Sequence, residues 1–368
     1  MPRKSDIWCD QCVCLCDKPL PIGNPMLIIR NMTPAIYLFA IATLTPALLI
    51  GIGAVEGGIW IGLAVIYLTG FVSIADRIIT RVSPHDEFPS GTGLNVTLAL
   101  VHLILMPLVV MALAAKTLSM VEKTGLFFAA GLFMGQVSNA NAHELIHRST
   151  RPLHRLGMWV YITMLFGHHT SAHVLVHHRH VATAKDPNTS RQGESFYRYA
   201  PRAWWGSFIK GYRAETARLA KINRPAWRNP YVIYLSGAIL FIGLTGWVGG
   251  IKGGILYIAL AGHAQMQLLM SDYVQHYGLT RSTQNGKPEP VSARHSWNSP
   301  HWLSSAMMLN ATRHSDHHAH PARPYPTLTL PNEAPMLPRP LPLMASIALI
   351  PPLWRRMMDP LAEQWKDA

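Results

Sequence analysis

The chain has 368 residues, of which 49% are hydrophobic and only 14% are charged, and its formal net charge is +13 at pH 7. About a quarter of the residues of a soluble domain are charged, so this composition excludes an ordinary water-soluble enzyme and favours a membrane protein. No basic stripe interleaved with surface aromatic residues forms a nucleic-acid-binding module. The positive charge therefore indicates contact with an anionic membrane leaflet or an acidic protein partner.

The two ends of the chain differ from the apolar middle. All four cysteines lie in CDQCVCLC, residues 9–16, a cluster that could bind metal or accept electrons. We expect residues 1–32 to form a tail that contains these cysteines, or to precede the true start of synthesis, and residues 33–368 to form a single domain. Because no cysteine follows, disulfides cannot hold that domain together, as expected for a site that faces a reducing cytoplasm. The proline-rich stretch 327–342 is predicted to be an extended strap.

Six stretches of about 20 apolar residues could cross a bilayer as helices, in which the backbone groups satisfy one another. They are 34–55, 59–75, 94–115, 125–142, 231–248 and 254–270. The short connections EGG and GGIKGG indicate helical hairpins. The predicted fold class is therefore all-α integral membrane, with six transmembrane helices.

A seventh apolar stretch, RLGMWVYITMLFGHH at 155–169, is shorter and ends in histidines, so we predict an interfacial or re-entrant helix. Lysine and arginine set the orientation of the bundle. Residues 143–230 contain 14 of them, whereas the loops between the predicted hairpin helices contain few. The termini, this long segment, and the loop that contains Arg77 and Arg81 are therefore predicted to be cytoplasmic.

Histidines cluster in AHELIHR at 142–148, AHVLVHHRH at 172–180, QHYG at 275–278 and RHSDHHAHP at 313–321. All four clusters fall on the predicted cytoplasmic side. Independently placed surface histidines do not explain that coincidence, whereas one polynuclear metal site does. Three pairs are spaced i,i+4, so on a helix each pair projects from one face and can converge on a metal ion. These pairs are His143/His147, His173/His177 and His314/His318.

The number of histidines indicates two metal ions. His178 and His317 each lie beside a member of a pair, and His276 brings the set to nine, which is too many for one tetrahedral ion. Imidazole suits iron, zinc, copper or nickel, so the ligand type does not select the metal. A site at the mouth of a lipid-embedded bundle suits a substrate that partitions into the bilayer. An inert C–H bond needs a redox metal, because it offers a Lewis acid such as zinc no carbonyl to polarise.

Two other functions remain open from the residues alone. HELIH matches the H-E-x-x-H pattern of zinc proteases, with Glu144 as general base, but one zinc leaves six or more histidines unexplained. A metal transporter or sensor is the non-enzymatic alternative, and it needs metal-binding polar residues at the bilayer midplane. The spans offer only isolated candidates, such as His102 and His263, which are more simply interpreted as polar groups that pack helices together.

The motifs HELIH, HVLVHHRHVATAKDP, QHYGL and RHSDHHAHPARPY resemble the histidine signatures of the membrane-bound alkane 1-monooxygenases, relatives of the integral-membrane fatty acid desaturases and of xylene monooxygenase. The resemblance implies two non-haem iron ions in a bacterial-type cytoplasmic membrane. It implies O2-dependent hydroxylation of the terminal methyl group of medium- or long-chain n-alkanes, with electrons from rubredoxin and its reductase. A xylene-type aromatic side-chain hydroxylase or a fatty acyl desaturase shares this metal site and remains an alternative.

The resemblance also assigns roles to individual residues. The metal ligands that it implies are His143, His147, His173, His177, His178, His276, His314, His317 and His318. Glu144, Asp186 and Asp316 are expected to accept hydrogen bonds from the other ring nitrogens of these ligands, which would fix the ring orientations. Four more histidines are expected to lie outside the ligand set: His168, His169, His180 and His320.

Three residues depart from the alkane-hydroxylase pattern. Ala172 replaces an acidic residue, Val176 replaces the glycine before a histidine pair, and Gln275 replaces the glutamate before His276. Xylene monooxygenase also has alanine at the position of Ala172, so these changes concern the substrate more than the metal site. Bulky residues of the first four spans, Trp60 or Phe133 for example, are candidates for limiting the length of the substrate chain.

Overall fold

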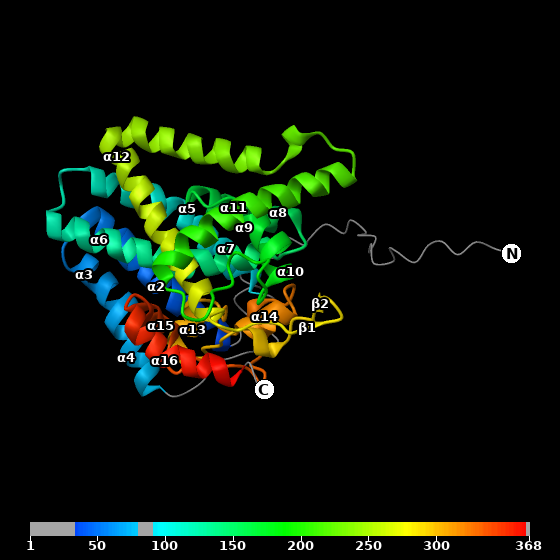
Figure 1. Ribbon diagram of the computed structural model, residues 1–368. Coiled ribbons are helices and arrows are strands. Elements are labelled where there is room, and N and C mark those ends of the chain that lie inside the picture. The colour runs from blue at the N-terminus through cyan, green and yellow to red at the C-terminus, as the bar shows by residue number, and fades with distance from the viewer. Residues whose placement is uncertain (1–33, 80–90, 366–368) are drawn as a thin grey trace.

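The computed structural model describes residues 34–79 and 91–365, and most of these residues are helical (Figure 1). The cysteine cluster at 9–16 and Arg81 lie outside the described residues. The first half of the chain forms two pairs of long helical segments. They are α2 (Pro34–Glu56), the continuous helix of α3 (Ile59–Ile66), η1 (Tyr67–Phe71) and α4 (Val72–Ile78), then α5 (Thr92–Ala114), and the continuous helix of α6 (Met120–Phe133), η2 (Met134–Ser138) and α7 (Asn139–Ile146).

Four helices are long and apolar enough to cross a membrane, which indicates a membrane protein. They are Ala35–Glu56, Ile59–Ile78, Thr92–Ala114 and Tyr231–Gln275. The last contains two predicted spans, so five of the six predicted stretches lie in these four helices. The remaining stretch, 125–142, lies in the continuous helix 120–146, which is not among the four. The prediction of six spans is thus confirmed only in part.

Helix α12 (Tyr231–Gln275) bends sharply at Gly250, where φ is 65° and ψ is −174°. Only glycine adopts this backbone conformation without strain. A second glycine is needed nearby, because a Cβ on Gly253 would lie 2.7 Å from the carbonyl oxygen of Thr245. The sequence GGIKGG therefore makes the bend that separates the two predicted spans. Before the bend, side chains such as Leu240 and Trp247 are exposed, as expected for a surface that faces lipid.

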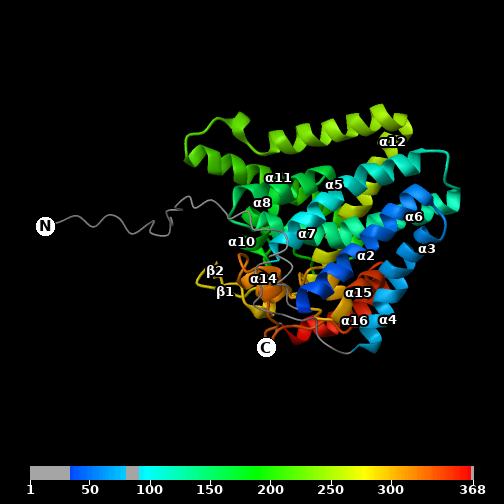
Figure 2. The same ribbon diagram turned by 180° about the vertical axis from the view of Figure 1, so that it is seen from behind.

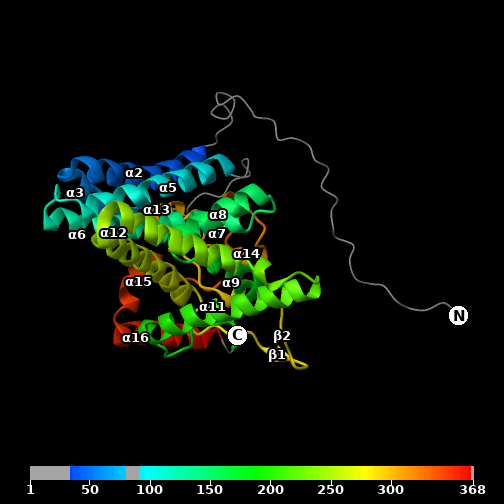
Figure 3. The same ribbon diagram turned by 90° about the horizontal axis from the view of Figure 1, so that it is seen from above.

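The long helices lie side by side, with α5 in contact with α2, α6 and α12 (Figure 3). The turns at 57–58 and 115–119 and the bend at Gly250 lie at one end of the bundle, here called the turn end (Figures 1 and 2). Helices α10 (His178–His180) and α14 (His314–Ala319) lie toward the opposite end, the histidine end. The chemistry-bearing motifs are therefore gathered at one end.

Shorter elements complete the histidine end. In chain order they are α8 (Arg151–Thr163), α9 (His169–Ala172), η3 (His173–His177), α11 (Phe196–Lys221), η4 (Ala226–Arg228), β1 (Thr283–Gln284), β2 (Lys287–Pro288), η5 (Ala293–His295), α13 (Trp302–Met307), η6 (Tyr325–Thr327), α15 (Leu341–Ala348) and α16 (Pro351–Gln364). Strands β1 and β2 pair antiparallel, with Thr283 opposite Pro288, across a tight turn at Asn285 and Gly286. Their hairpin projects beyond the helices (Figure 1).

Two further segments singled out in the sequence can be traced in the structure. The stretch 155–169 contributes to α8, whose 13 residues are too few to cross a bilayer as a helix, and Tyr161 and Ile162 are buried. The strap at 327–342 has little regular secondary structure before α15 begins at Leu341. It is held because Asn298 N–H donates to the Pro335 carbonyl and Leu337 N–H donates to the Asn298 carbonyl, each at 2.8 Å. The strap leads into α15 and α16, two helices that we did not predict.

Candidate metal centre

The fold brings all nine predicted histidines together, in two groups. Within each group the nitrogen atoms lie within 4.8 Å of one another. The five-histidine group consists of His143, His147, His173, His178 and His317, and the four-histidine group consists of His177, His276, His314 and His318. Histidines from α7, η3, α10, α14 and the end of α12 meet here although up to 175 residues separate them in sequence, from His143 to His318.

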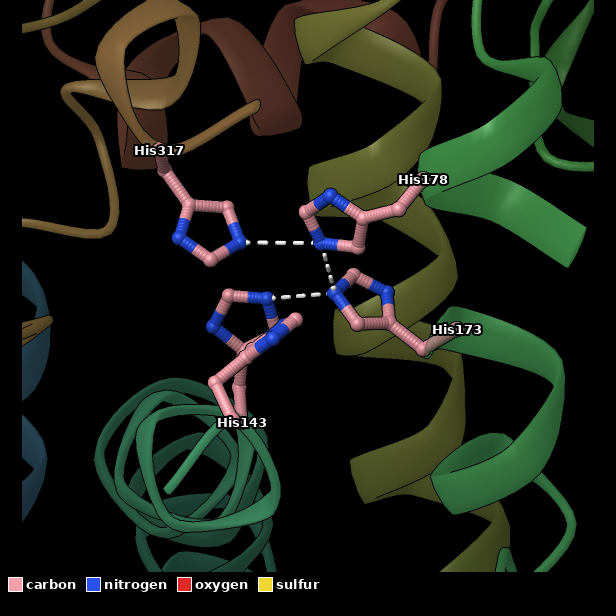
Figure 4. Close-up of side chains that lie close together, drawn as sticks. His143, His173, His178 and His317 are labelled. Carbon is pink, nitrogen blue, oxygen red and sulfur yellow. Dashed lines mark hydrogen bonds between the residues drawn. The ribbon is translucent and has the colours of Figure 1, made fainter. Parts of the chain in front are cut away.

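The Nε2 atoms converge within each group. In the five-histidine group (Figure 4), Nε2 of His173 lies 2.7 Å from Nε2 of His143 and 2.9 Å from that of His178, and the Nε2 atoms of His178 and His317 are 3.1 Å apart. In the four-histidine group, the Nε2 atom of His314 lies 3.0 Å from that of His276 and 3.1 Å from that of His318.

These distances fit a metal centre. Metal–nitrogen bonds of about 2.0–2.1 Å place neighbouring ligand atoms about 2.9 Å apart in octahedral geometry and about 3.3 Å apart in tetrahedral geometry. The Nε2 atoms of His147 and His177 are buried and have no hydrogen-bond partner, which is costly unless a ligand completes the site. All of the donors are imidazole nitrogens, a set that suits iron, zinc, copper or nickel.

The electrostatics also favour metal binding. Burial, and then the neighbouring histidines, hold the pKa values of His147, His173 and His178 well below the usual value for histidine. Burial similarly lowers the pKa of His143 and that of His276 to about 3. These rings are therefore neutral near pH 7. A neutral imidazole keeps a lone pair for a metal ion.

The local backbone decides which histidines share a group. The segment His173–His177 is a π-helix, and the N–H of His178 bonds to the carbonyl of His173. This i,i+5 pattern brings His178 over His173 and turns His177 toward the other group. The prediction that the i,i+4 pair His173/His177 converges on one metal ion is therefore wrong, because it assumed an ordinary α-helix.

Adjacent histidines consequently point to different groups at two places. His177 and His178 are divided between the four- and five-histidine groups, and so are His318 and His317 in α14. The i,i+4 pairs His143/His147 and His314/His318 each stay within one group, as predicted.

Asp186 accepts a hydrogen bond from a site histidine, as expected. Its Oδ2 atom lies 2.8 Å from Nδ1 of His177, and Thr189 Oγ1 and the Asn188 N–H also donate to this carboxylate. Burial alone would lower the pKa of His177, but the charge and hydrogen bond of Asp186 outweigh burial and raise it. Burial would likewise raise the pKa of Asp186, yet His177 and the other donors hold it low. The pair fixes the His177 ring with its Nε2 atom toward the group.

Glu144 and Asp316 do not have the expected role. Glu144 forms a salt bridge with Arg148 at 2.7 Å and accepts from the N–H of Tyr325 at 3.3 Å. Asp316 pairs with Arg323 at 2.7 Å and with His320 at 2.9 Å. Both carboxylates are used in contacts that hold the polypeptide around the site. The expectation rested on their closeness in sequence to site histidines, but on short helices these neighbours face away.

The four histidines expected outside the set lie outside both groups. His168 packs its ring against Trp204 and Phe208, and His169 stacks on Phe166. His320 is largely exposed and pairs with Asp316, while His180 is partly exposed. These side chains lie around the groups rather than in them.

Sequence reasoning missed Asp272 and Asn188. Asn188 Nδ2 donates to Asp272 Oδ2 at 2.7 Å, and Asn188 N–H donates to Asp186, so the two carboxylates are linked behind His177. Asp272 lies one helical turn before His276 in α12, a spacing that could have revealed it. Nothing in the sequence near Asn188 indicates its role.

A cavity of about 380 Å³ reaches both groups, with His143, His173 and His314 in its wall. Most of its lining is apolar and comes from η1, α6, η2, α12, α15 and the residue that follows α15. Examples are Leu68, Leu132, Met266, Met270, Leu343 and Leu349. Trp60 and Phe133, which we considered as limits on chain length, do not line this cavity. Trp60 is exposed and Phe133 is packed in the core.

The geometry disfavours both alternatives raised by the sequence. Glu144, the expected base of a zinc protease, is held by Arg148, while His143 and His147 share their group with three further histidines. Of the two histidines available to a transporter, Nε2 of His102 lies 2.9 Å from Thr163 Oγ1, and the ring of His263 packs edge-on against phenylalanines of α6. Both act as helix-packing groups, as predicted.

Comparison with known proteins agrees with the geometry. The model of the fatty acid desaturase family matches residues 123–339, which include all nine histidines. Alkane 1-monooxygenase 2 of Pseudomonas aeruginosa is 31% identical over 353 residues, covering 91% of this chain and 93% of that protein. Alkane 1-monooxygenase of Ectopseudomonas oleovorans is 31% identical over 352 residues, covering 89% and 86%.

A more distant relative carries a different name. The hydroxylase component of the xylene/toluene monooxygenase of Pseudomonas putida is 27% identical over 229 residues, which cover 61% of this chain and 60% of that protein. The chain therefore belongs to the fatty acid desaturase family and, within it, to the membrane-bound alkane 1-monooxygenases, which are oxidoreductases.

Proposed function

We propose that this protein hydroxylates the terminal methyl group of medium- or long-chain n-alkanes to 1-alkanols, with O2 as co-substrate and two iron ions as cofactor. The observation that carries the proposal is the shared cavity, whose mostly apolar walls end at His143 and His173 of one group and His314 of the other. A hydrocarbon chain in this cavity has its end beside both groups. The overall reaction consumes the alkane, O2, two electrons and two protons, and yields the alcohol and water.

Iron, when bound by the nine histidines, supplies the one-electron chemistry that O2 activation and C–H cleavage require. The polypeptide supplies the remaining requirements. Asp186 orients His177, and the π-turn at 173–177 divides neighbouring histidines between the groups. Leu68, Met266 and other apolar side chains position the alkane and exclude bulk water, which would otherwise compete for the reactive site.

Electrons are proposed to come from rubredoxin, which is reduced by rubredoxin reductase. The proposed location is a bacterial-type cytoplasmic membrane with the histidine end in the cytoplasm. This orientation is supported by the 14 lysines and arginines of residues 143–230, because cytoplasmic segments are enriched in basic residues. A soluble electron carrier could then reach the histidine end directly.

The decisive experiment measures metal per chain in detergent-purified protein, followed by turnover of octane and of xylene on the same sample with rubredoxin, reductase and NADH. We expect about two irons per chain and formation of 1-octanol. Two irons with benzylic alcohol as the only product would keep the site but assign an alkyl-aromatic substrate. Zinc alone, with no oxygenated product after reconstitution with iron, would contradict the proposal.

A further inference from the structure

We propose that a basic surface beside the four-histidine group is the docking site for an acidic electron-carrier protein. The inference rests on the proposed function, because an electron carrier is needed only if the centre performs redox chemistry. It adds the place of docking, the charge of the partner and the point at which electrons enter.

Four cations define this surface, here called the basic rim: Arg179, Lys185, Lys210 and Arg281. Their segments are tied together. Arg281 donates from its guanidinium to the carbonyl of Arg179 at 3.1 Å, and Lys210 Nζ donates to the carbonyl of Lys185 at 2.6 Å. His180 lies among them, close enough to Lys185, Arg281 and Arg179, and to the buried Asp186, to interact electrostatically with all four. The side chains of Arg179 and Lys185 are exposed.

The neighbouring carboxylates balance the charge of the rim only in part, because Glu289 and Asp186 interact electrostatically with Arg281, one of the four cations. Within the described part of the chain, no salt bridge joins Arg179, Lys185, Lys210 or Arg281 to an acidic side chain. The nearby acids are otherwise occupied, since Asp186 pairs with His177, Glu194 with Arg202, and Glu289 with His295. The rim therefore keeps a net positive charge, which attracts an acidic partner over a distance of about a Debye length.

A hollow of about 270 Å³ adjoins the rim. Its wall includes Thr183, Asp186 and Thr280, so it borders Lys185 and Arg281 directly along the chain. The carboxylate of Asp186 is one hydrogen bond of 2.8 Å from the ring of His177, in the four-histidine group. The Asp186 side chain itself is buried, so a carrier seated over this hollow lies close to the four-histidine group without touching it.

The same surface reaches the five-histidine group. Exposed Arg179 directly follows His178, whose Nε2 atom lies 2.9 Å from that of His173. Consecutive residues at 177–179 thus connect one patch of surface to both groups. An anionic lipid headgroup could bind the positive charge of the rim, but lipid binding does not require a path from the rim to the metal site. Electron transfer does require such a path, so the observations favour a redox protein over a membrane surface.

The test is a charge reversal, Lys185→Glu combined with Lys210→Glu, assayed with reduced rubredoxin as the carrier. We expect the KM for rubredoxin to rise about tenfold at low ionic strength, and the difference to shrink as salt is added, because salt screens exposed charges. The KM for octane and the iron content should stay unchanged. Arg179→Glu is the second variant, for use if the double variant fails to fold.

Two controls separate docking from other causes. Lys221→Glu combined with Arg224→Glu makes the same change in charge at exposed residues at the end of α11 and should leave the KM for rubredoxin unchanged. Anaerobic reduction of the rim variants by dithionite should proceed at the wild-type rate, because this small reductant needs no docking surface.

Three results would overturn the inference. An unchanged KM for rubredoxin in both rim variants would show that the carrier docks elsewhere. Weaker binding to phosphatidylglycerol vesicles with unchanged rubredoxin kinetics would assign the rim to lipid headgroups. An absence of rubredoxin-dependent turnover in the wild-type protein would instead refute the proposed function, and with it the need for a carrier.

Discussion

The two ends of the helical bundle are built in different ways. At the turn end, glycines and one capping box reverse the chain between apolar helices. At the histidine end, buried polar groups are linked over long distances in sequence, for example from Asn188 to Asp272 and from Glu144 to Tyr325. The turn end therefore serves to connect helices, whereas at the histidine end contacts between distant polar residues hold a single site together.

The two histidine groups also differ within their end. All four rings of the four-histidine group are buried, and Asp186 fixes one of them, whereas His143, His147 and His178 of the five-histidine group are partly exposed. His143 and His173 of the five-histidine group line the cavity, whereas only His314 of the four-histidine group does so. We infer that the four-histidine group is the more rigid and that the five-histidine group meets more of the substrate.

The largest expected effect is at the histidine end, from His173→Ala. His173 contacts His143 and His178 through Nε2 and also lines the cavity. Octane turnover should fall at least about 100-fold, and iron should fall from about two ions to about one, because a ligand is lost. His320→Ala is the matched control, since His320 is exposed and pairs only with Asp316. Equal losses in the two variants would contradict the assignment of the ligand set.

A smaller effect is expected from Asp186→Asn. The amide keeps the shape of the side chain but cannot hold a charge-assisted hydrogen bond with His177, so the iron affinity of the four-histidine group should fall about 10- to 100-fold. Chelator competition followed by metal analysis measures this change. Glu144→Gln is the comparison variant, because Glu144 contacts Arg148 and a backbone N–H rather than a site histidine. A similar loss of iron in Glu144→Gln would show that Glu144 does orient a site histidine, as the sequence first suggested.

The sequence predicts the identity of the nine histidines better than it predicts their arrangement. Spacing and clustering are local properties, so His143 and His147 could be paired correctly from the sequence. The division of His173 from His177 depends on a π-turn, which the spacing of residues does not reveal. In the same way, the apolar stretches reveal helices such as α5, whereas the contacts of Asp272 depend on packing between distant segments.

At the turn end, we expect an effect on stability but none on chemistry, and Gly57→Ala tests this. Gly57 has a φ of +69°, and a Cβ there would lie 2.8 Å from Oε1 of Glu122. The free energy of unfolding should fall by about 1–2 kcal/mol, because an L side chain disfavours this conformation. Unfolding in detergent measures the change, while iron content and turnover per folded molecule should stay at wild-type values. Gly62→Ala, at a helical position with open space around its Cβ, is the control and should not destabilise.

The smallest expected effect is from Glu122→Gln in the capping box at the turn end. The Glu122 carboxylate accepts hydrogen bonds from the hydroxyl and N–H of Ser119 and from the N–H of Gly58. These hydrogen bonds, that of the Ser119 hydroxyl foremost, lower the pKa of Glu122 to about 2. Because Glu122 is partly exposed at the turn end, solvent screens the interaction, and we expect Tm to fall by only about 1–2 °C near neutral pH.

The pH dependence of this small difference gives its cause. A carboxyl group whose pKa is lower in the folded protein stabilises the fold above the pKa of the unfolded chain, and this stabilisation is lost as the pH falls through the folded value. The Tm difference between wild type and Glu122→Gln should therefore be constant above about pH 5 and shrink from about pH 4.5 toward about pH 2. Metal-free protein should be used in detergent, so that loss of iron in acid does not contribute. A Tm difference that does not change with pH would attribute the effect to the shape of the cap instead of its charge. Any loss of octane turnover in this variant would show that the turn end affects the chemistry at the histidine end.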